Sequence, residues 1–381
     1  MMVKLGDLGQ IITGNTPKTN EKHNYNSKDI CFVKPSDIDE ENISLIEKSV
    51  FYISERARNK SKIVPKNSIL VTCIGIIGKV AITNVECAFN QQINGIVLEE
   101  SKCIPNYVAY AIQFQKKYIQ EVANNAVVPI LNKTQFSNIE ISLPSLEEQR
   151  KIAKTLDKVS DLIAKRKQQL EKLDLLVKSK FVEMFGDINS SELYPYKKIK
   201  DFTIVISGGT PDRNNSEYWD NGCIPWVKTT ELQNSLINET QEKITVDGMK
   251  NSSAKLVPPN TILLAMYGQG KTRGMTGYLG FESTTNQACA CILPSETINQ
   301  KYLWKYLIFS YDKLRNLAKG GNQPNLNCNM IKEFEVLFPP IELQNKFADF
   351  VQQTEQSKIL INKSLEKMET LKKALMQEYF G

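Results

Sequence analysis

The chain repeats itself at about half its length, and this repeat constrains the fold more than any other feature of the sequence. The clearest copy begins at residues 143–149 (LPSLEEQ), which return as residues 338–344 (FPPIELQ). The register then holds without a gap until residues 185–186 meet residues 380–381. A chain of 381 residues also exceeds the size at which a single core keeps growing. Two similar halves with similar C-terminal segments are therefore predicted.

The segments that precede these two copies repeat as well, though less closely. Each short marker taken alone has a plainer interpretation, because Thr-Pro and Val-Pro-x-Asn are common turn sequences. Turn chemistry does not explain why all of them recur in one order at a nearly constant offset. The matching segments are 13–17 and 207–211, 32–34 and 226–228, 64–70 and 257–263, 90–91 and 286–287, and 129–132 and 324–327.

Residues 146–184 and 341–380 are predicted to form two long helices. Pro144 shapes the turn before the first helix, Ser145 can cap it, and Glu147 and Glu148 suit the positive end of a helix. No proline or glycine follows until Gly186. A helix of this length would measure roughly 58 Å, which is too long for one small domain to cover.

Apolar residues at heptad spacing predict one seam along each helix, interrupted in the first helix by Arg166 and Lys180. We therefore expect the two helices to cover each other as an antiparallel coiled coil. The alternative is that each is an independent surface helix. The expected seam residues are Leu156, Val159, Ile163, Leu170, Leu173, Val177 and Met184 in the first helix, and Phe347, Val351, Ile361, Leu365, Met368, Leu375 and Tyr379 in the second.

The segments before the helices have the pattern of α+β domains. Short β-type runs alternate with Gly, Asn and Pro turns, and helical stretches are expected at 106–124 and 300–318. The predicted fold class is α+β, with two similar α/β domains, each followed by a long helix, and pseudo-two-fold symmetry. The predicted domains are residues 1–142, 143–186, 187–337 and 338–381.

Composition limits the environment and the cofactors. The net charge of +6 permits nucleic-acid binding without requiring it. None of the eight cysteines forms a CxxC pair and no secretory signal precedes them, so we expect reduced thiols and a cytoplasmic protein. With one histidine, His23, and a lone Cys289-Ala-Cys291 in an apolar run, no zinc site is expected. No apolar stretch is long enough to predict a membrane span.

One segment imitates a nucleotide-binding motif. Residues 267–272 (YGQGKT) end like a phosphate-binding loop, but Ala265 stands where that motif needs a glycine. The alternative is a glycine-rich loop whose cations contact DNA phosphates. Neither a histidine-based nor a paired-carboxylate catalytic group stands out, so we expect no catalytic site in this chain.

Over essentially its whole length the sequence resembles the DNA-specificity subunit of type I restriction-modification systems. The most specific elements are the two Leu/Phe-Pro-x-x-Glu-x-Gln helix openers and the passages from Gly-x-Thr-Pro to Val-Lys. The resemblance implies a non-catalytic subunit in which each domain reads one half of a bipartite, asymmetric DNA target. The long helices would set the spacer between the halves and dock methyltransferase subunits.

The resemblance also implies the partners and cofactors. The chain would bind double-stranded DNA, two methyltransferase subunits and two restriction subunits that translocate DNA. It would hold no cofactor itself, and S-adenosylmethionine, ATP and Mg²⁺ would be bound by those partners.

Candidate DNA contacts are polar and cationic side chains in the turns, because Lys and Arg suit phosphates while Asn, Gln and Thr suit base edges. The alternative for the two Asn-Gln pairs is that they only satisfy turn backbone. A P-loop ATPase or nuclease, and an assembly protein that never meets DNA, are the competing hypotheses. The candidates are Lys18, Lys34, Lys79, Asn90, Gln91 and Lys133 in the first half, and Lys228, Thr229, Lys271, Arg273, Asn286 and Gln287 in the second.

Overall fold

The computed structural model describes residues 1–123, 129–188, 190–318 and 325–381. Contacts group the chain into two units. Unit 1 comprises Met1–Lys167 with Asn362–Gly381, and unit 2 comprises Gln168–Ile361. Each unit contains one of the predicted domains, here called head 1 (1–142) and head 2 (187–337), together with parts of both long helices.

Head 1 is built on a five-stranded sheet. Neighbouring strands within this sheet are antiparallel, except that the edge strand β4 runs parallel to β8. A smaller sheet and a two-stranded ribbon complete the β-structure. The strand orders are β2 (Gly9–Thr13), β10 (Ile93–Leu98), β7 (Ile69–Thr72), β8 (Val80–Thr83), β4 (Ser44–Ile46); then β5 (Tyr52–Ile53), β3 (Ile30–Val33), β9 (Cys87–Phe89), β6 (Ile63–Val64); and β1 (Met2–Lys4) with β11 (Glu140–Ser142).

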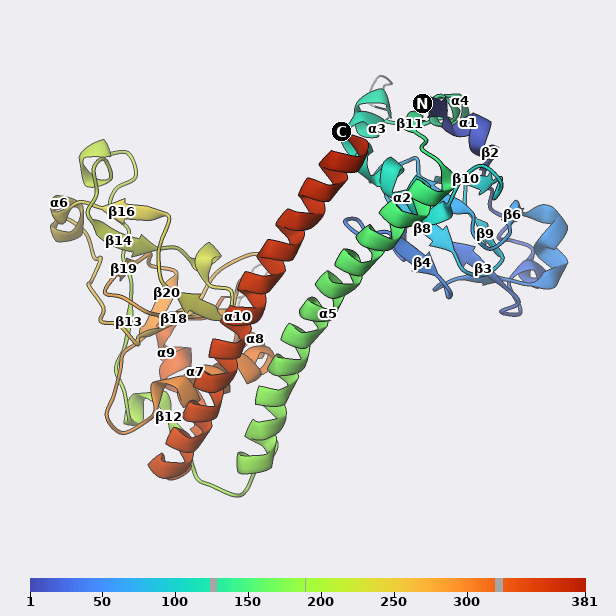
Figure 1. Ribbon diagram of the computed structural model, residues 1–381. Helices are drawn as coiled ribbons and strands as arrows, with labels where there is room; N and C mark the ends of the chain where they lie inside the picture. The colour runs from blue at the N-terminus through green and yellow to red at the C-terminus, as the bar shows by residue number, and fades with distance from the viewer. Residues whose placement is uncertain (124–128, 189, 319–324) are drawn as a thin grey trace. The chain divides into compact units, whose positions relative to one another are not determined.

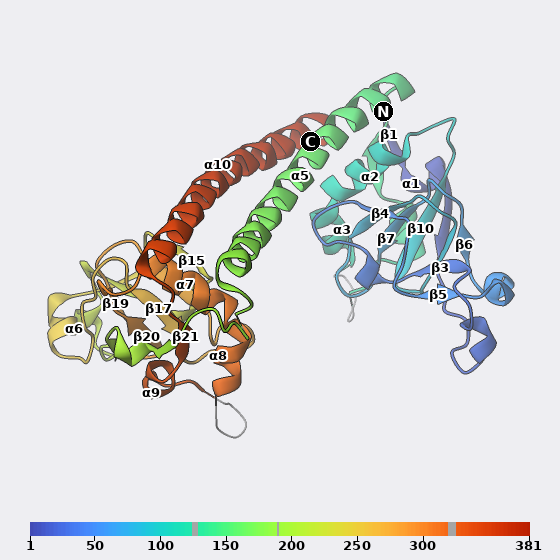
Figure 2. The ribbon, with the colours of Figure 1, turned by 90° about the horizontal axis from the view of Figure 1, so that it is seen from below.

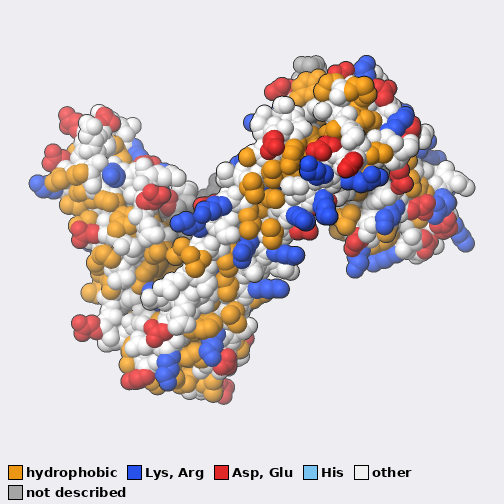
Figure 3. Space-filling model, in the orientation of Figure 1, with side chains coloured by type: hydrophobic (Ala, Val, Ile, Leu, Met, Phe, Trp, Pro, Cys, Tyr) orange, Lys and Arg blue, Asp and Glu red, His pale blue; other side chains and the backbone are white. Residues whose placement is uncertain are grey.

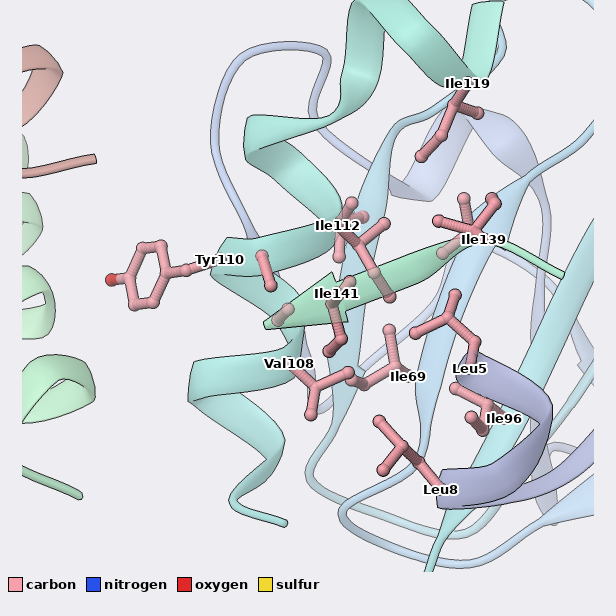
Figure 4. Close-up of a cluster of buried hydrophobic side chains, with 14 of the residues drawn as sticks. Leu5, Leu8, Ile69, Ile96, Val108, Tyr110, Ile112, Ile119, Ile139 and Ile141 are labelled. Carbon is pink, nitrogen blue, oxygen red and sulfur yellow. The ribbon is translucent and has the colours of Figure 1, made fainter. Parts of the chain in front are cut away.

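Four helices accompany these strands: α1 (Leu5–Leu8), α2 (Pro105–Phe114), α3 (Lys116–Ala123) and α4 (Lys133–Ser137). The main core of head 1 lies between the large sheet and these helices, and Figure 4 shows its side chains converging from β7, β10, β11, α1 and α2. In that view the hydroxyl of Tyr110 points away from the cluster. Tyr110 donates to Asp157 of the long helix instead, at 2.9 Å.

Head 2 repeats this topology, except that, among the described residues, its smaller sheet has three strands where that of head 1 has four. The large sheet keeps the same order with a parallel edge pair, β15 and β18, and the smaller sheet keeps its parallel pair, β14 and β19. The strand orders are β13 (Val205–Ser207), β20 (Cys289–Ile292), β17 (Ile262–Ala265), β18 (Thr276–Leu279), β15 (Ser235–Ile237); then β16 (Glu242–Ile244), β14 (Ile224–Val227), β19 (Thr284–Thr285); and β12 (Tyr196–Lys198) with β21 (Glu335–Leu337).

The helices of head 2 are α6 (Val246–Lys250), α7 (Gln300–Phe309), α8 (Tyr311–Leu317) and α9 (Cys328–Lys332). Each predicted helical stretch is in fact two helices, because the chain leaves helical geometry at Gln115 and Ser310. Asn124 and Pro324, which the sequence placed in a helix and in a repeated turn, lie outside the described residues. Short 3₁₀ helices occupy Lys22–Asn24, Pro35–Asp37, Glu55–Lys60, Ile199–Asp201, Ser216–Tyr218 and Thr229–Glu231.

The repeated Val-Pro-x-Asn turns have a backbone reason. Asn67 and Asn260 both adopt the left-handed conformation, at φ of 68° and 66°. Asparagine tolerates this region better than most residues. Each backbone N–H donates to a strand of the large sheet at 2.7 Å, to Thr83 O and Leu279 O. The motif therefore sets the start of the adjacent strand in both heads.

The two long helices are α5 (Leu146–Phe185) and α10 (Ile341–Phe380), which confirms the predicted stretches. They lie side by side in both ribbon views (Figures 1 and 2). An ion pair joins Lys167 to Glu369 at 3.2 Å in unit 1, and another joins Lys358 to Asp174 at 2.5 Å in unit 2. Along α5 the partner residue on α10 moves from Glu369 back to Lys358, so the pair is antiparallel.

The predicted seam holds only in part. Leu156, Val159, Ile163 and Val177 are buried, but after Val177 burial follows Phe181 and Phe185 instead of the heptad position Met184. The seam prediction was wrong there because the end of α5 packs against head 2. Likewise, on α10 Met376 is buried while the predicted seam residues Ile361, Leu365, Met368, Leu375 and Tyr379 are half-buried.

A buried glutamine ties each long helix to the head that precedes it. Gln149 Oε1 accepts from Ile104 N–H at 2.9 Å, and Gln344 Oε1 accepts from Asn299 N–H at 2.9 Å. Both side chains are fully buried. This explains why the helix openers both end in Glu-x-Gln.

The C-terminal end of each long helix packs, through an aromatic residue, against the head that does not immediately precede that helix in the sequence. The Phe185 ring lies 5.2 Å from the Tyr302 ring of α7 in unit 2. The Phe380 ring lies 5.2 Å from the Tyr107 ring of α2 in unit 1. Each head is therefore held by the start of its own long helix and by the end of the other.

Candidate nucleic-acid interface

Four loops converge at one end of the large sheet in each head. In head 1, Cys73 N–H donates to Gln92 O at 2.8 Å, and Leu131 N–H donates to Cys73 O at 3.0 Å. In head 2, Met266 N–H and Leu326 N–H make the matching bonds. We define loop cluster 1 as residues 14–18, 73–79, 90–92 and 129–133, and loop cluster 2 as residues 208–213, 266–275, 286–288 and 325–328.

A glycine allows the first loop of each cluster to approach the Asn-Gln turn. A Cβ at Gly14 would collide with the carbonyl oxygen of Asn90, and a Cβ at Gly208 would collide with that of Asn286. Any other residue would push the loops apart. The repeated glycine of the Gly-x-Thr-Pro motif is therefore a packing requirement.

The same side-chain bond closes both clusters. Thr16 Oγ1 donates to Gln91 Oε1 at 2.6 Å, and Thr210 Oγ1 donates to Gln287 Oε1. All four residues are exposed or half-buried. The two heads thus present the same scaffold of polar groups to solvent.

The candidates of head 1 divide into exposed and engaged side chains. Lys18, Gln91 and Lys133 are exposed within loop cluster 1. Lys79 Nζ instead donates to the carbonyl oxygens of Pro35 and Ile38, at 3.2 and 3.0 Å.

Two further candidates of head 1 also make internal contacts. Lys34 Nζ lies 3.2 Å from the centre of the Phe51 ring. Asn90 is buried and exchanges hydrogen bonds with Gln92, at 2.9 and 3.2 Å. For Asn90 the geometry is that of a residue satisfying its own turn, which was the alternative interpretation.

The candidates of head 2 lie around loop cluster 2. Lys271 is exposed and Arg273 half-buried in the loop between β17 and β18. Thr229 is half-buried at the start of a 3₁₀ helix. The Oδ1 atom of Asn286 is buried and accepts no hydrogen bond from the described residues.

Lys228 belongs to a charged cluster that the sequence did not reveal. Lys228 Nζ and Arg213 NH1 both contact Glu242, at 2.6 and 2.5 Å. Burial raises the pKa of Glu242, but the hydrogen bonds from Lys228 and Arg213 outweigh it and lower the pKa below its ordinary value. Arg213 and Glu242 are far apart in the sequence and have no counterpart motif in head 1, so only the fold brings them together.

The loop that imitates a nucleotide-binding motif has a different structure. Residues 267–272 connect β17 to β18, which pair as antiparallel neighbours. A phosphate-binding loop leads from a strand into a helix, whose N-terminus meets the phosphates. The P-loop hypothesis is therefore wrong for this segment.

In sequence, residues 270–273 (GKTR) correspond only loosely to residues 78–80 (GKV), and the structure changes this match. The loop between β7 and β8 has seven residues, 73–79, and its counterpart has ten, 266–275. Gly78 and Gly274 match, since both have positive φ and lie against a long cation, Lys116 or Arg315. The counterpart of Lys79 is thus Met275, and Lys271 has no equivalent in head 1.

Comparison with known proteins decides the family. A sequence model described as the type I restriction modification DNA specificity domain matches residues 1–173 and 192–371. The chain belongs to this family of specificity subunits. These subunits are the non-catalytic, DNA-recognising members of type I restriction-modification systems, and they assemble with methyltransferase and restriction subunits.

Two relatives, both specificity subunits, cover different shares of the chain. The chain is 26% identical to the type I restriction enzyme MjaIX specificity subunit of Methanocaldococcus jannaschii, across 98% of this chain and 90% of that one. It is 33% identical to the HindI specificity subunit of Haemophilus influenzae, across 46% and 39%.

Solved structures share the fold of this specificity subunit. The type I S subunit from M. genitalium covers 100% of this chain and 96% of its own, with a TM-score of 0.58 and 14% identity. A chain from a study of complex assembly in a type I R-M system covers 100% and 97%, with a TM-score of 0.58 and 15% identity.

Two negative findings concern the described part of this specificity subunit. Across residues 1–123, 129–188, 190–318 and 325–381, no group of three or more His, Cys, Asp or Glu could hold a metal ion. Over those same ranges no helix is both long and apolar enough to cross a membrane.

Cys289 and Cys291 lie buried in β20, and burial raises the pKa of the Cys291 thiol to about 12.

Proposed function

We propose that each head reads one half of an asymmetric, bipartite DNA target through its loop cluster. The observation that supports this proposal is that both heads hold their loops in the same way. The matching glycine contacts and Thr–Gln hydrogen bonds support loops whose exposed side chains differ between the heads. Two similar loop frameworks can each dock on duplex DNA, because its geometry is the same at both half-sites. Different side chains on those frameworks would contact different bases. The antiparallel pair α5 and α10 would set the spacing between the halves.

Within this proposal the candidate residues take different roles. The exposed cations Lys18, Lys133 and Lys271, together with the half-buried Arg273, would meet phosphates. Base edges would be read by Gln91, Gln287 and Thr229, and the remaining candidates, Lys34, Lys79, Asn90, Lys228 and Asn286, would hold the loops in place. Support comes from the exposure of the first two groups and from the side-chain contacts of Lys34, Lys79, Asn90 and Lys228. Asn286 holds its turn through backbone hydrogen bonds to Val227 and Cys289.

The long helices would also dock two methyltransferase subunits, which two restriction subunits would join. Apolar side chains remain exposed on both helices, including Leu162 and Leu175 on α5 and Leu360 and Leu371 on α10. Figure 3 shows hydrophobic and basic side chains together along this part of the surface. Such apolar patches commonly mark protein contacts.

In the same proposal, S-adenosylmethionine, ATP and Mg²⁺ would belong to the partner subunits and not to this chain. The complex would work in the cytoplasm, where DNA is found and free thiols such as Cys73 and Cys87 stay reduced.

Reconstitution tests the proposed function. The purified chain alone should neither methylate nor cleave DNA, and adding a cognate methyltransferase subunit should give adenine methylation at one bipartite sequence. Sequencing of methylated DNA is the readout. Methylation at unrelated sites in the presence of the chain would refute the proposal.

The competing hypothesis, an assembly protein that never meets DNA, makes a different prediction about how salt affects the DNA affinity of the complex. A protein that contacts phosphates loses DNA affinity steeply as salt rises, because counterions are released on binding. The affinity of the complex should therefore fall with a steeper slope than that of the methyltransferase alone. Equal slopes would favour a scaffold that never touches DNA.

A further inference from the structure

Arg213 of head 2 is held against two tryptophans. Its guanidinium carbon lies 3.7 Å from the centre of the Trp219 ring and 4.5 Å from that of Trp226. The two indoles meet edge to face, with centroids 5.0 Å apart. Guanidinium groups are stabilised over aromatic faces, and such stacking fixes the plane of the group.

The loop that carries Arg213 is fastened at several points. Trp226 Nε1 donates to Gly209 O, and Trp219 Nε1 donates to Asp212 O, both at 2.9 Å. The Thr210–Gln287 bond joins the same loop to the Asn-Gln turn of loop cluster 2. The arginine is therefore presented at the edge of loop cluster 2 by backbone with little freedom.

The guanidinium still faces solvent. The Arg213 side chain is 48% exposed, whereas the indole of Trp226 beneath it is buried. Its contact with Glu242 is made through NH1, so the other nitrogens of the fork are not used by that ion pair. Because Lys228 shares the same carboxylate, the three-residue cluster keeps one net positive charge.

We propose that Arg213 reads a guanine in the half-site of head 2, a role that rests on the function proposed above. A planar fork of N–H donors matches the O6 and N7 acceptors of guanine in the major groove, which is the commonest specific contact between protein and DNA. A side chain that only held the loop would need neither a half-exposed position nor free donors. A phosphate would accept the same fork, but a phosphate contact would not depend on the identity of the base.

Head 1 has no arginine at the position that matches Arg213. Aligning Thr16-Pro17 with Thr210-Pro211 puts Thr19 at the position of Arg213. The nearby cation of head 1, Lys60, is occupied by Glu21 at 2.6 Å. This guanine contact is therefore assigned to head 2, and the matching position of head 1 offers no equivalent of it.

Arg213→Lys is the central test, because lysine keeps the charge and loses the planar fork. Arg58→Lys is the matched control: Arg58 is a comparably exposed arginine of head 1, paired with Glu55 and with Glu86. Each variant would be assembled with a cognate methyltransferase subunit and presented with DNA in which both half-sites are randomised. Methylated sequences would be counted, and thermal melting would check that each variant is folded.

The wild-type complex should prefer guanine at one position of the half-site assigned to head 2 by exchanging residues 187–337. Arg213→Lys should reduce that preference roughly tenfold or more, and leave the other positions and the other half-site unchanged. Arg58→Lys should leave every preference unchanged. An unaltered motif, or an equal loss of methylation on all sequences, would overturn the assignment of Arg213. Failure of the wild-type complex to select any sequence would instead overturn the proposed function.

Discussion

Gln149 and Gln344 show how one residue can govern where a long helix starts. Each amide accepts a backbone N–H from the head and donates to the carbonyl of a preceding proline, Pro144 or Pro339, at 2.9 and 2.8 Å. Both glutamine side chains are fully buried, so these hydrogen bonds are made away from bulk water. Removing the amide leaves buried polar groups without partners, which is the costly case for hydrogen bonds.

Gln344→Ala should destabilise unit 2 by about 2 kcal/mol, because Asn299 N–H and Pro339 O lose their partner. All three tryptophans of the chain, Trp219, Trp226 and Trp304, lie in unit 2, so tryptophan fluorescence during urea unfolding reports this unit. Gln356→Ala, at an exposed site on the same helix, is the control. A shift no larger than that of the control would contradict the role of Gln344.

The exposed and buried cysteines should differ in how fast their thiols react. Cys223 is exposed, whereas Cys87 and Cys291 are buried, and burial raises the pKa of each of these two thiols to about 12. At pH 8 a disulfide reagent should therefore label Cys223 rapidly and the two buried thiols only after unfolding. Cys223→Ser should remove the fast phase. Rapid labelling of β9 or β20 in the folded protein would show that these strands open.

Among the elements, the ends of the long helices depart most from the coiled-coil pattern. Phe181 and Phe185 follow i, i+4 spacing because they face α7 of head 2 as well as the start of α10. A heptad describes two helices that pack only on each other. Where a helix also packs on a sheet domain, a wider apolar face is needed.

Phe185→Ala should destabilise unit 2 by about 3–5 kcal/mol, because the ring is fully buried between Tyr194, Tyr302 and Phe347. Urea unfolding followed by tryptophan fluorescence measures the loss. Val182→Ala, on the exposed face of the same turn, should change stability little. Equal effects of the two substitutions would mean that the end of α5 does not hold head 2.

At the scale of the whole molecule, the two units are built alike but are not continuous in sequence. Unit 1 needs the end of α10 and unit 2 needs the end of α5. Truncating either long helix would therefore remove packing from the head that lies far away in the sequence. Each loop cluster, in contrast, is formed within one head.

Exchanging residues 187–337 for the matching segment of a relative should change one half-site of the target and leave the other half-site and the spacer length intact. The physical reason is that loop cluster 2 is formed within this segment, while loop cluster 1 and both long helices lie outside it. Mapping of methylated sites reads out both halves separately. A wholly new target would contradict independent heads.

The sequence alone was sufficient for the architecture, because a duplicated order of turns, strands and helix openers leaves few other arrangements. The helix limits near 146 and 341, the α+β heads and the family all followed from motifs that act locally through caps, turns and glycine contacts. Even the alternative role of Asn90 could be read from turn chemistry.

Only the tertiary structure decided which polar residues share a surface. The meeting of Arg213 with Trp219 and Glu242, the capture of Lys79 by backbone carbonyls, and the extra residues around Lys271 depend on loops that the sheets bring together. The contacts of Arg213 with Glu242 and of Lys79 with Pro35 join residues tens of positions apart and leave no periodic trace in the chain. The sequence determined that there are two heads, and the packing of their loops determined what each head can read.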